Sequence, residues 1–305
     1  VTGVQTCALP ILGMLNLNQL KEREGLRAQQ AKLGDELAFA EEHKLPWGFE
    51  GWSSNHTSTL SCPEHGDYEQ FTLVGKDFRG AETFKHSRCP SCIRAEQTSV
   101  KSSLRKLHVT SLLNDAGITR RFGDCEFENY LELNPEASRN LAACRRYADN
   151  WPAVLEAGKS LVLTGSCGTG KNHLAVSLAK NIIRNHLASV ELTDVMRLTR
   201  AVKSTWRHNA DITEESVLDH YASLDLLVID EVGVQFGSPA EMTILHEVIN
   251  ARYESVLPTI LISNLPPEQL KEFISDRIFD RVTDGGRNYL VFNWASFRGN
   301  NGVIA

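Results

Sequence analysis

The stretch from residue 160 to 185 constrains the fold of this chain more than any other. An apolar run, "SLVLTG", leads through a glycine-rich loop, "SCGTGKN", into a segment with helical spacing, "HLAVSLAKNIIRN". A strand, a glycine-rich loop and a helix in this order are typical of a phosphate-binding loop. Glycines allow successive backbone N–H groups to turn toward one anion, and the helix N-terminus adds positive potential. We therefore expect an α/β fold with a phosphate site at this junction.

The loop supplies most of the candidate nucleotide contacts, and we expect Lys171 to reach the outer phosphates. The usual loop has a serine or threonine after the lysine, because that hydroxyl holds magnesium, but here Asn172 follows. An amide oxygen can also face magnesium, although less readily, so Asn172 is a candidate ligand. The candidate contacts are Gly165, Ser166, Cys167, Gly168, Thr169, Gly170, Lys171, Asn172 and His173.

Four more short apolar segments follow, at residues 189–194, 224–230, 259–264 and 289–293. Helical segments of ten or more residues separate most of them, which favours a parallel sheet covered on both faces. We predict a three-layer sandwich of the phosphate-loop class.

Polar side chains end two of these segments. Asp230 can hold magnesium directly or through water, and Glu231 can polarise an attacking water. Asn264 would orient the same water from the neighbouring strand end. The alternative is a buried strand that happens to end in acidic residues.

The segment "SDRIFDR" places Arg277 and Arg281 one helical turn apart on one face. An arginine supplied by a neighbouring subunit can stabilise the charge that develops in phosphoryl transfer. The alternative is that both arginines are surface ion-pair partners.

Two cysteine and histidine pairs lie before residue 96: Cys62 and His65, then Cys89 and Cys92. Four such ligands complete a tetrahedral zinc site with no open position, so we expect a structural zinc ion. His86 can replace one ligand, and the alternative is a set of unligated surface thiols. Cysteines 125, 144 and 167 are scattered, which suits a reducing compartment and a cytoplasmic protein.

The formal net charge of −6 gives no global reason to expect nucleic acid, but one segment is locally basic. Residues 194–209 place four basic residues within about a 120° arc of an ideal helix, opposite Val195, Leu198, Ala201, Val202 and Trp206. They are either contacts for a single-stranded DNA backbone or the solvated face of a packed helix. The four are Arg197, Arg200, Lys203 and Arg207.

The region before the α/β fold divides into several parts. Residues 18–43 have helical spacing and form either a solvated arm or a partner-binding helix. Residues 52–96 are turn-rich, and a polar helix runs from about Glu96 to Ala116. We expect a helical, zinc-ribbon-like module over 14–96, a helical linker over 97–118 and the α/β domain over 119–305. Residues 1–13 are expected to be translated sequencing adaptor; the natural chain then either begins near Met14 or has lost its true start. No run reaches the roughly 18 apolar residues of a membrane span.

Several segments together resemble a known family. "GTGKNHLA", "LDLLVIDEVGVQFG", "LISNL", "SDRIFDRV" and "VFNWASFR" occur in the order and approximate spacing of the DnaC-type replicative helicase loaders, a branch of the AAA+ ATPases. The resemblance covers about residues 119–300, and the asparagine after the lysine is shared with the family. It implies that Arg281 is the arginine finger with Arg277 beside it, or the reverse, and that Arg298 is a sensor arginine.

The resemblance also implies a function. The protein would use ATP and Mg²⁺ to load a DnaB-type hexameric helicase onto single-stranded DNA, would form homo-oligomers with ATP or helicase, and would grip the helicase through its zinc-bearing module. One alternative is a regulator of transposition like IstB, which acts on double-stranded target DNA. Another is an ATP-binding adaptor with little turnover. The zinc ligands and "GKNHLA" favour the loader.

Overall fold

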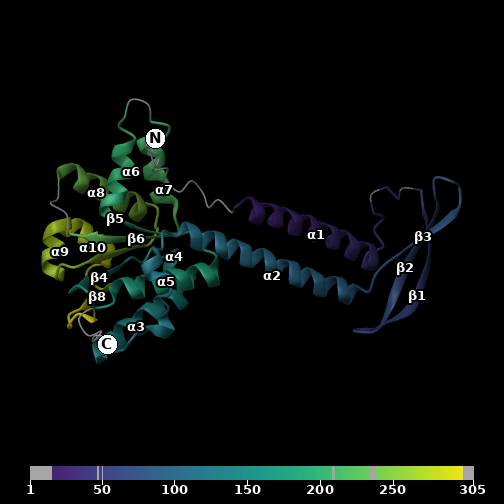
Figure 1. Cartoon of the computed structure of the whole chain (residues 1–305), viewed down its shortest axis with the longest axis horizontal. Coiled ribbons are helices and arrows are strands. Elements are labelled where there is room, and N and C mark those ends of the chain that lie inside the picture. Colours follow the sequence, from purple (N-terminus) through teal and green to yellow (C-terminus); the bar gives the residue numbers. More distant parts are fainter. Residues whose placement is uncertain (1–15, 47, 50, 208–209, 234–237, 298–305) are drawn as a thin grey trace, which may run out of the picture. The chain divides into compact units, whose positions relative to one another are not determined.

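The computed structural model describes residues 16–46, 48–49, 51–207, 210–233 and 238–297. The chain forms two compact units, residues 14–110 and residues 111–305 (Figure 1). Each has its own hydrophobic core and carries its own candidate site.

The unit formed by residues 14–110 consists of two helices and a three-stranded antiparallel sheet. Helix α1 spans Leu17–Glu41, and strands β1 (Ser53–Cys62), β2 (Gly66–Lys76) and β3 (Glu82–His86) pair in that order. These strands replace the turns predicted for the region, because β1, "SSNHTSTLSC", carries hardly any of the apolar alternation that marks a strand. Helix α2 spans Pro90–Asp115 and begins earlier than the predicted Glu96.

Two small cores hold this unit together. Leu33 and Ala40 of α1 pack with Ile93 and Val100 of α2. Phe39, Phe71 and Leu73 form the second core, against which Trp52 packs. Gly75 has no room for a side chain, since a Cβ there would lie 2.2 Å from the Trp52 ring.

The unit formed by residues 111–305 is built on a five-stranded sheet of order β5-β6-β7-β4-β8, and each pair of neighbours is parallel. All five predicted strands are confirmed. Their bounds are β4 Leu161–Gly165, β5 Val190–Asp194, β6 Leu226–Val232, β7 Thr259–Ser263 and β8 Tyr289–Phe292.

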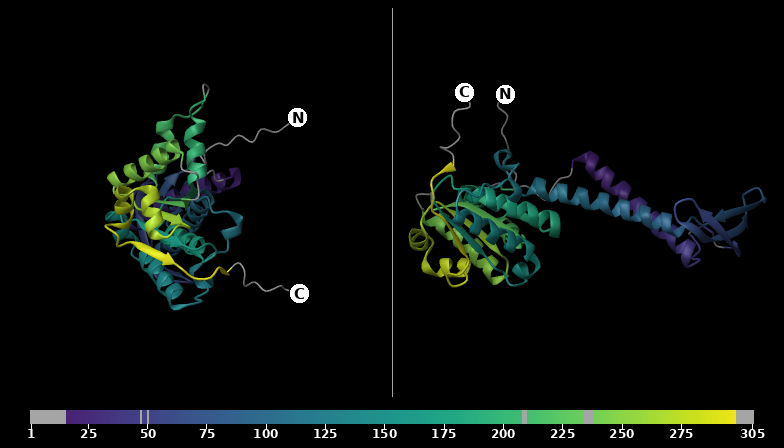
Figure 2. Two further views of the ribbon diagram at one scale, coloured as in Figure 1. Left: turned by 90° about the vertical axis from the view of Figure 1, so that its left-hand side faces the viewer. Right: turned by 90° about the horizontal axis from the view of Figure 1, so that it is seen from below.

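Helices cover both faces of this sheet, which confirms the three-layer α/β class (Figure 2). One layer contains α3 (Pro135–Asp149), α4 (Trp151–Glu156) and α5 (Lys171–His186). The other layer contains α6 (Val195–Ser204), α7 (Glu214–Ser223), α8 (Pro239–Glu254), α9 (Pro267–Ile274) and α10 (Asp276–Thr283). Two short 3₁₀ turns, η1 (Arg120–Phe122) and η2 (Phe127–Asn129), precede α3.

The strand order determines what meets at the edge of the sheet. Strand β7 lies between β6 and β4, so the ends of these three strands are neighbours. The pairing of β6 with β7 is interrupted between Ile229 and Val232. Such an irregularity takes the residues within it out of register with the neighbouring strand. Those residues are Asp230 and Glu231, and Asp230 still pairs with Asp194 of β5 on the other side.

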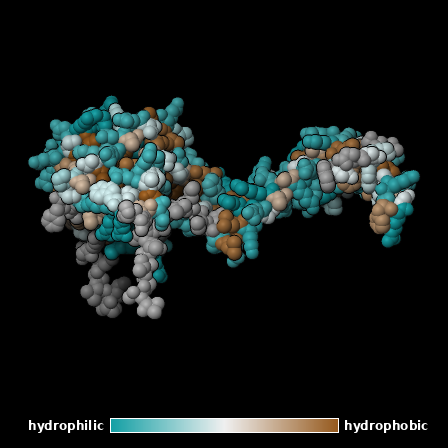
Figure 3. All heavy atoms as spheres, turned by 90° about the horizontal axis from the view of Figure 1, so that it is seen from above, coloured by the Kyte–Doolittle hydropathy of each residue, from teal (hydrophilic) through white to brown (hydrophobic). Residues whose placement is uncertain are grey.

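The surface in Figure 3 shows mainly hydrophilic side chains, with hydrophobic ones scattered among them. Among the residues that the structure describes, no helix combines the length and apolar character required to cross a membrane.

Candidate functional site

The phosphate loop (residues 165–172) joins β4 to α5. At two of its positions only glycine fits, because φ is positive and neighbouring atoms leave no room for a Cβ. Gly165 has φ 128° and Gly170 has φ 94°. A Cβ at Gly165 would lie 2.3 Å from the Phe292 carbonyl oxygen, and one at Gly170 would lie 2.7 Å from the Tyr130 ring. Substitution at either position would therefore push the loop away from its neighbours.

Lys171 is buried, with 5% of its surface exposed, at the first position of α5. Its ammonium group donates to the carbonyl oxygens of Gly165 and Ser166, each at 2.7 Å. The charge is thus held inside the curve of the loop, where a phosphate oxygen can replace a carbonyl oxygen as its partner.

Asn172 and Asp230 come together at this edge of the sheet. The Asn172 Nδ2 group donates to Asp230 Oδ2 at 2.5 Å, and Asp230 Oδ1 accepts from the Glu231 backbone N–H at 2.7 Å. Burial raises the pKa of Asp230, and the hydrogen bonds from Glu231 and Asn172 oppose that rise. A carboxylate beside an amide oxygen is a donor set that fits Mg²⁺.

Glu231 stands in an unusual backbone conformation. Its φ of 59° lies in the left-handed region, which is costly for a residue with a side chain. Burial raises the pKa of its carboxyl, and the charges of Asp230 and Asp194 raise it further. Asn264, the residue after β7, lines the same pocket. The predicted water-activating residues therefore share one space.

This pocket has a volume of about 540 Å³ and extends from Asp230 and Glu231 along the phosphate loop. His173 lines it and packs edge-to-face against Tyr130, with ring centroids 5.3 Å apart. The backbone N–H of Phe297 donates to the Gly168 carbonyl at 2.9 Å. Sequence reasoning missed the aromatic lining, because these residues lie in loops without periodicity; they are Phe122, Tyr130, Trp294 and Phe297. Flat apolar walls of this kind suit a purine base.

Asp194 is a further acidic residue that sequence reasoning missed. It ends β5 opposite Asp230 of β6 and caps α6 by accepting from the Arg197 backbone N–H at 2.7 Å. The Arg197 Nε group lies 3.1 Å from Asp194 Oδ2. Arg197, which was predicted to contact DNA, therefore also lies near Asp230 and Glu231. All three residues line a second pocket of about 290 Å³.

The basic face of residues 194–209 differs from the prediction at its end. Helix α6 stops at Ser204, so Trp206 and Arg207 lie beyond it and the predicted helical position of Arg207 is wrong. The Thr205 hydroxyl and backbone N–H both bond to the Val202 carbonyl, which closes the last turn. Trp206 was predicted to pack but is 56% exposed.

The rest of this helix follows the prediction. Val195, Leu198 and Val202 are buried on one side, and the other side carries Arg197, Arg200 and Lys203. The Lys203 ammonium lies 3.7 Å from Glu241.

The two arginines of α10 differ in their surroundings. Arg277 is exposed, whereas Arg281 donates to Asn250 Oδ1 and lies 4.7 Å above the Tyr253 ring. Among the described residues that line the nucleotide pocket, neither arginine occurs. Arg298, the predicted sensor arginine, lies outside the described residues.

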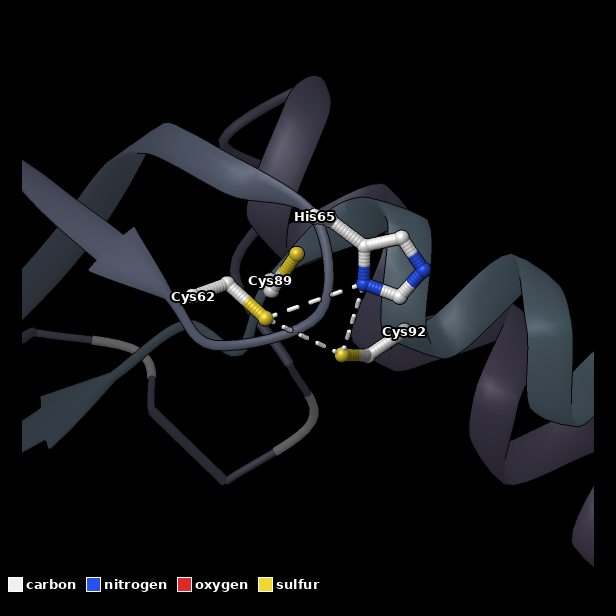
Figure 4. A group of neighbouring side chains, drawn as sticks. All are labelled: Cys62, His65, Cys89 and Cys92. Carbon is white, nitrogen blue, oxygen red and sulfur yellow. Dashed lines mark hydrogen bonds between the residues drawn. The ribbon is translucent and has the colours of Figure 1, made fainter.

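The predicted zinc ligands converge at the end of the three-stranded sheet (Figure 4). The ligand atoms of Cys62, His65, Cys89 and Cys92 all lie within 4.8 Å of one another. Cys62 ends β1, His65 follows in the turn to β2, and Cys92 lies in the first turn of α2. The set offers three thiols and one imidazole, which fits a structural zinc ion. His86 is not in the group, because its Nδ1 bonds to the Thr72 hydroxyl at 2.9 Å.

The thiols of this cluster differ in acidity. The backbone N–H of Glu64 and then the His65 ring lower the pKa of Cys62 to about 6. Hydrogen bonding to Cys62 and burial raise the pKa of Cys92 to about 12. A bound cation would stabilise both thiolates together.

Comparison with known proteins agrees with this geometry. Residues 94–285 match the family described as IstB-like ATP binding protein. The chain is 34% identical over 203 residues to the replicative helicase loader DnaC of Buchnera aphidicola (strain Bp), covering 66% of this chain and 81% of the relative. It is 32% identical over 209 residues to the protein of the same name from Escherichia coli K12, covering 67% and 83%.

The fold also agrees with a solved structure. The crystal structure of the DnaC helicase loader superimposes with a TM-score of 0.51 at 22% identity, over 57% of this chain and 99% of that one. The phosphate loop and the strand order agree with these matches, which show that the chain belongs to the IstB/DnaC family of AAA+ ATP-binding proteins.

Proposed function

We propose that this protein loads a replicative DNA helicase onto single-stranded DNA under the control of ATP. One observation carries the proposal: the chain is similar over about two thirds of its length to proteins named replicative helicase loader. The assembled phosphate loop and acidic pair support an ATP-dependent cycle.

Each residue of the pocket has a role in this proposal. Lys171 contacts the outer phosphates, and Asn172 with Asp230 holds Mg²⁺, which neutralises phosphate charge when bound. Glu231 orients and polarises the attacking water, with Asn264 on its other side. The position of Glu231 supports this role, since it lies at the irregular end of β6 and lines the pocket together with Asp230.

A neighbouring subunit completes the site in this proposal. Arg281 or Arg277 reaches the phosphates of the next subunit, which fits their absence from the described lining of their own pocket. Hydrolysis would then require the loader to form oligomers, either in the presence of ATP or when bound to the helicase. Arg298 keeps its proposed sensor role outside the described residues.

The two macromolecular partners would bind different parts of the chain. The zinc-bearing unit grips the hexameric helicase, and the exposed side of α6 follows the DNA backbone through Arg197, Arg200 and Lys203, with Arg207 beyond the helix end. The buried opposite side of α6 supports this, because it anchors the basic side to the ATPase core.

Co-purification with candidate helicases, with and without ATP, tests the proposal. We expect Lys171→Ala to weaken ATP binding, and Glu231→Gln to bind ATP but abolish turnover. Cys89→Ser should lose the helicase and retain ATP binding. A protein that captures no replicative helicase under any nucleotide condition would exclude the loader role.

A second function is supported by the family match itself, which is to IstB-like proteins. A transposition regulator would bind double-stranded target DNA in the presence of ATP and ignore helicases. An adaptor with little turnover would bind ATP equally well in wild type and Glu231→Gln, with no difference in phosphate release.

A further inference from the structure

One wall of the nucleotide pocket is a loop segment with almost no regular structure. Residues 119–130, here named the strap, contain η1 and η2 and lie between α2 and α3. Strap residues that line the pocket are Arg121, Phe122, Cys125, Asn129 and Tyr130. A wall made of loop needs attachments to hold one position, and the strap is attached to α5.

The central attachment is Lys180, a buried lysine with 5% of its surface exposed. Its ammonium donates to the carbonyl oxygens of Gly123 at 2.8 Å and Cys125 at 2.9 Å, and it forms an ion pair with Glu126. All three partners belong to the strap. A buried ammonium is tolerated only when its donors are satisfied, and these three strap contacts satisfy them.

Glu126 is the matching group on the strap. Arg184, one turn after Lys180, donates to both its carboxylate oxygens at 2.8 and 2.9 Å. Burial raises the pKa of Glu126, but the bonds from Arg184 and Lys180 outweigh it and the net pKa is lowered. His173 Nε2 lies 2.9 Å from the Glu126 carbonyl oxygen. The spacing of His173, Lys180 and Arg184 places all three on one side of α5.

Helix α5 begins with Lys171 of the phosphate loop, so the same helix contacts both the phosphate loop and the strap. Tyr130 connects them further, because its ring packs on His173 and its hydroxyl donates to the Thr169 carbonyl at 3.5 Å. We propose that Lys180 is a positioning residue, which fastens the strap to α5 so that Phe122 and Tyr130 enclose the base of the bound nucleotide. This inference rests on the proposed ATP binding.

The proposal separates the base end of the ligand from its phosphate end. Contacts to the base are equal in the ground and transition states, so their loss should raise KM and leave kcat unchanged. Lys180→Met keeps the side-chain stem and removes the donors. We expect the KM and Kd for ATP to rise about tenfold, with kcat within about twofold. The affinity for inorganic tripolyphosphate, which has no base, should not change.

Two further variants complete this set. Lys180→Arg, which keeps a charged donor, should restore part of the ATP affinity and covers the case in which the methionine variant fails to fold. Lys159→Met, at an exposed lysine of the same unit, is the matched control and should leave every constant unchanged.

The Cys125 thiol, on the strap and in the pocket wall, gives a second readout. Alkylation of Cys125 is measured by mass spectrometry of the peptide that contains it, and ATP should slow it in the wild type. In Lys180→Met the alkylation of Cys125 should be fast without ATP and should be slowed little by ATP.

Unchanged KM and unchanged Cys125 protection, or an equal loss of ATP and tripolyphosphate affinity, would overturn the proposal. If the wild type binds no ATP, the proposed function fails, while alkylation without ATP still reports whether Lys180 holds the strap.

Discussion

At the residue scale, the burial of the Asp230 carboxylate costs the fold stability and leaves the carboxylate suited to bind a cation. Its carboxylate is largely withdrawn from water, beside Glu231 and Asp194, and its hydrogen bonds come from Asn172 and the Glu231 amide. A group arranged in this way is suited to a cation and is poorly solvated without one.

We predict that Asp230→Asn stabilises the protein while it abolishes Mg²⁺-dependent hydrolysis. The folded pKa of Asp230 is raised above its unfolded value of 3.8, so ionisation weakens the folded state as the pH rises from about 4. The melting temperature of the ATPase unit at pH 7 should rise by a few degrees, and the gain should shrink near pH 4. A lower melting temperature at pH 7 would contradict this account.

Asn172 allows a sharper test of metal binding. Asn172→Thr should retain ATP binding and raise hydrolysis, because a hydroxyl is the more usual magnesium ligand after the lysine. Asn172→Leu should keep the fold and lose the Mg²⁺-dependent part of the affinity. Both are measured by ATP titration with and without Mg²⁺. If the leucine variant binds ATP as well as the wild type under both conditions, Asn172 does not face the metal.

At the scale of elements, the helix pair α1 and α2 has a core of few residues. Leu33, Ala40, Ile93 and Val100 make it, and Ile93 directly follows Cys92 of the Cys/His cluster. Ion pairs between Arg88 and Glu36, and between Arg94 and Glu41, lie at the surface and add little. The apolar contacts therefore carry most of the stability of this pair.

Ile93→Ala should destabilise the zinc-bearing unit by about 2–5 kcal/mol, because Ile93 is fully buried and the site cannot fill the cavity. Chemical denaturation followed by circular dichroism measures the change. Ser99→Ala, on the exposed side of the same helix, serves as the control and should stay within about 0.5 kcal/mol. Equal effects of the two substitutions would show that this core is not the stabilising element.

For the whole molecule, the two sites belong to different units. The Cys/His cluster lies within residues 14–110, and the pocket at the phosphate loop lies within residues 111–305. Each ligand should therefore stabilise the unit that contains its site, since a ligand stabilises the folded state to which it binds.

We predict two calorimetric transitions with separate ligand dependence. Chelation of zinc, or Cys89→Ser, should remove or lower the transition of the zinc-bearing unit and leave the ATPase unit folded. ATP with Mg²⁺ at 100 times its Kd should stabilise the other transition by about 2.7 kcal/mol. Metal analysis should give about one zinc ion per chain. Loss of both transitions on chelation would contradict separate units.

The sequence by itself determined the features that are local along the chain. The phosphate loop, the five strands of the parallel sheet and the candidate zinc ligand pairs are each encoded in a few consecutive residues, through glycine positions, apolar runs and ligand spacing. The three antiparallel strands β1, β2 and β3 and the end of α6 escaped prediction. Strand β1 is polar and has no apolar period, and a helix end depends on a single turn.

Only the tertiary structure decided which distant residues share the nucleotide site. The order β5-β6-β7-β4-β8 brings Asp194 beside Asp230, and Glu231, at the irregular end of β6, lines the same pocket as the phosphate loop. Lys180 bonds to the strap, at residues that lie more than 50 positions earlier in the chain. Loop residues and buried ion pairs leave no periodic signal in a sequence, because their positions follow from long-range packing.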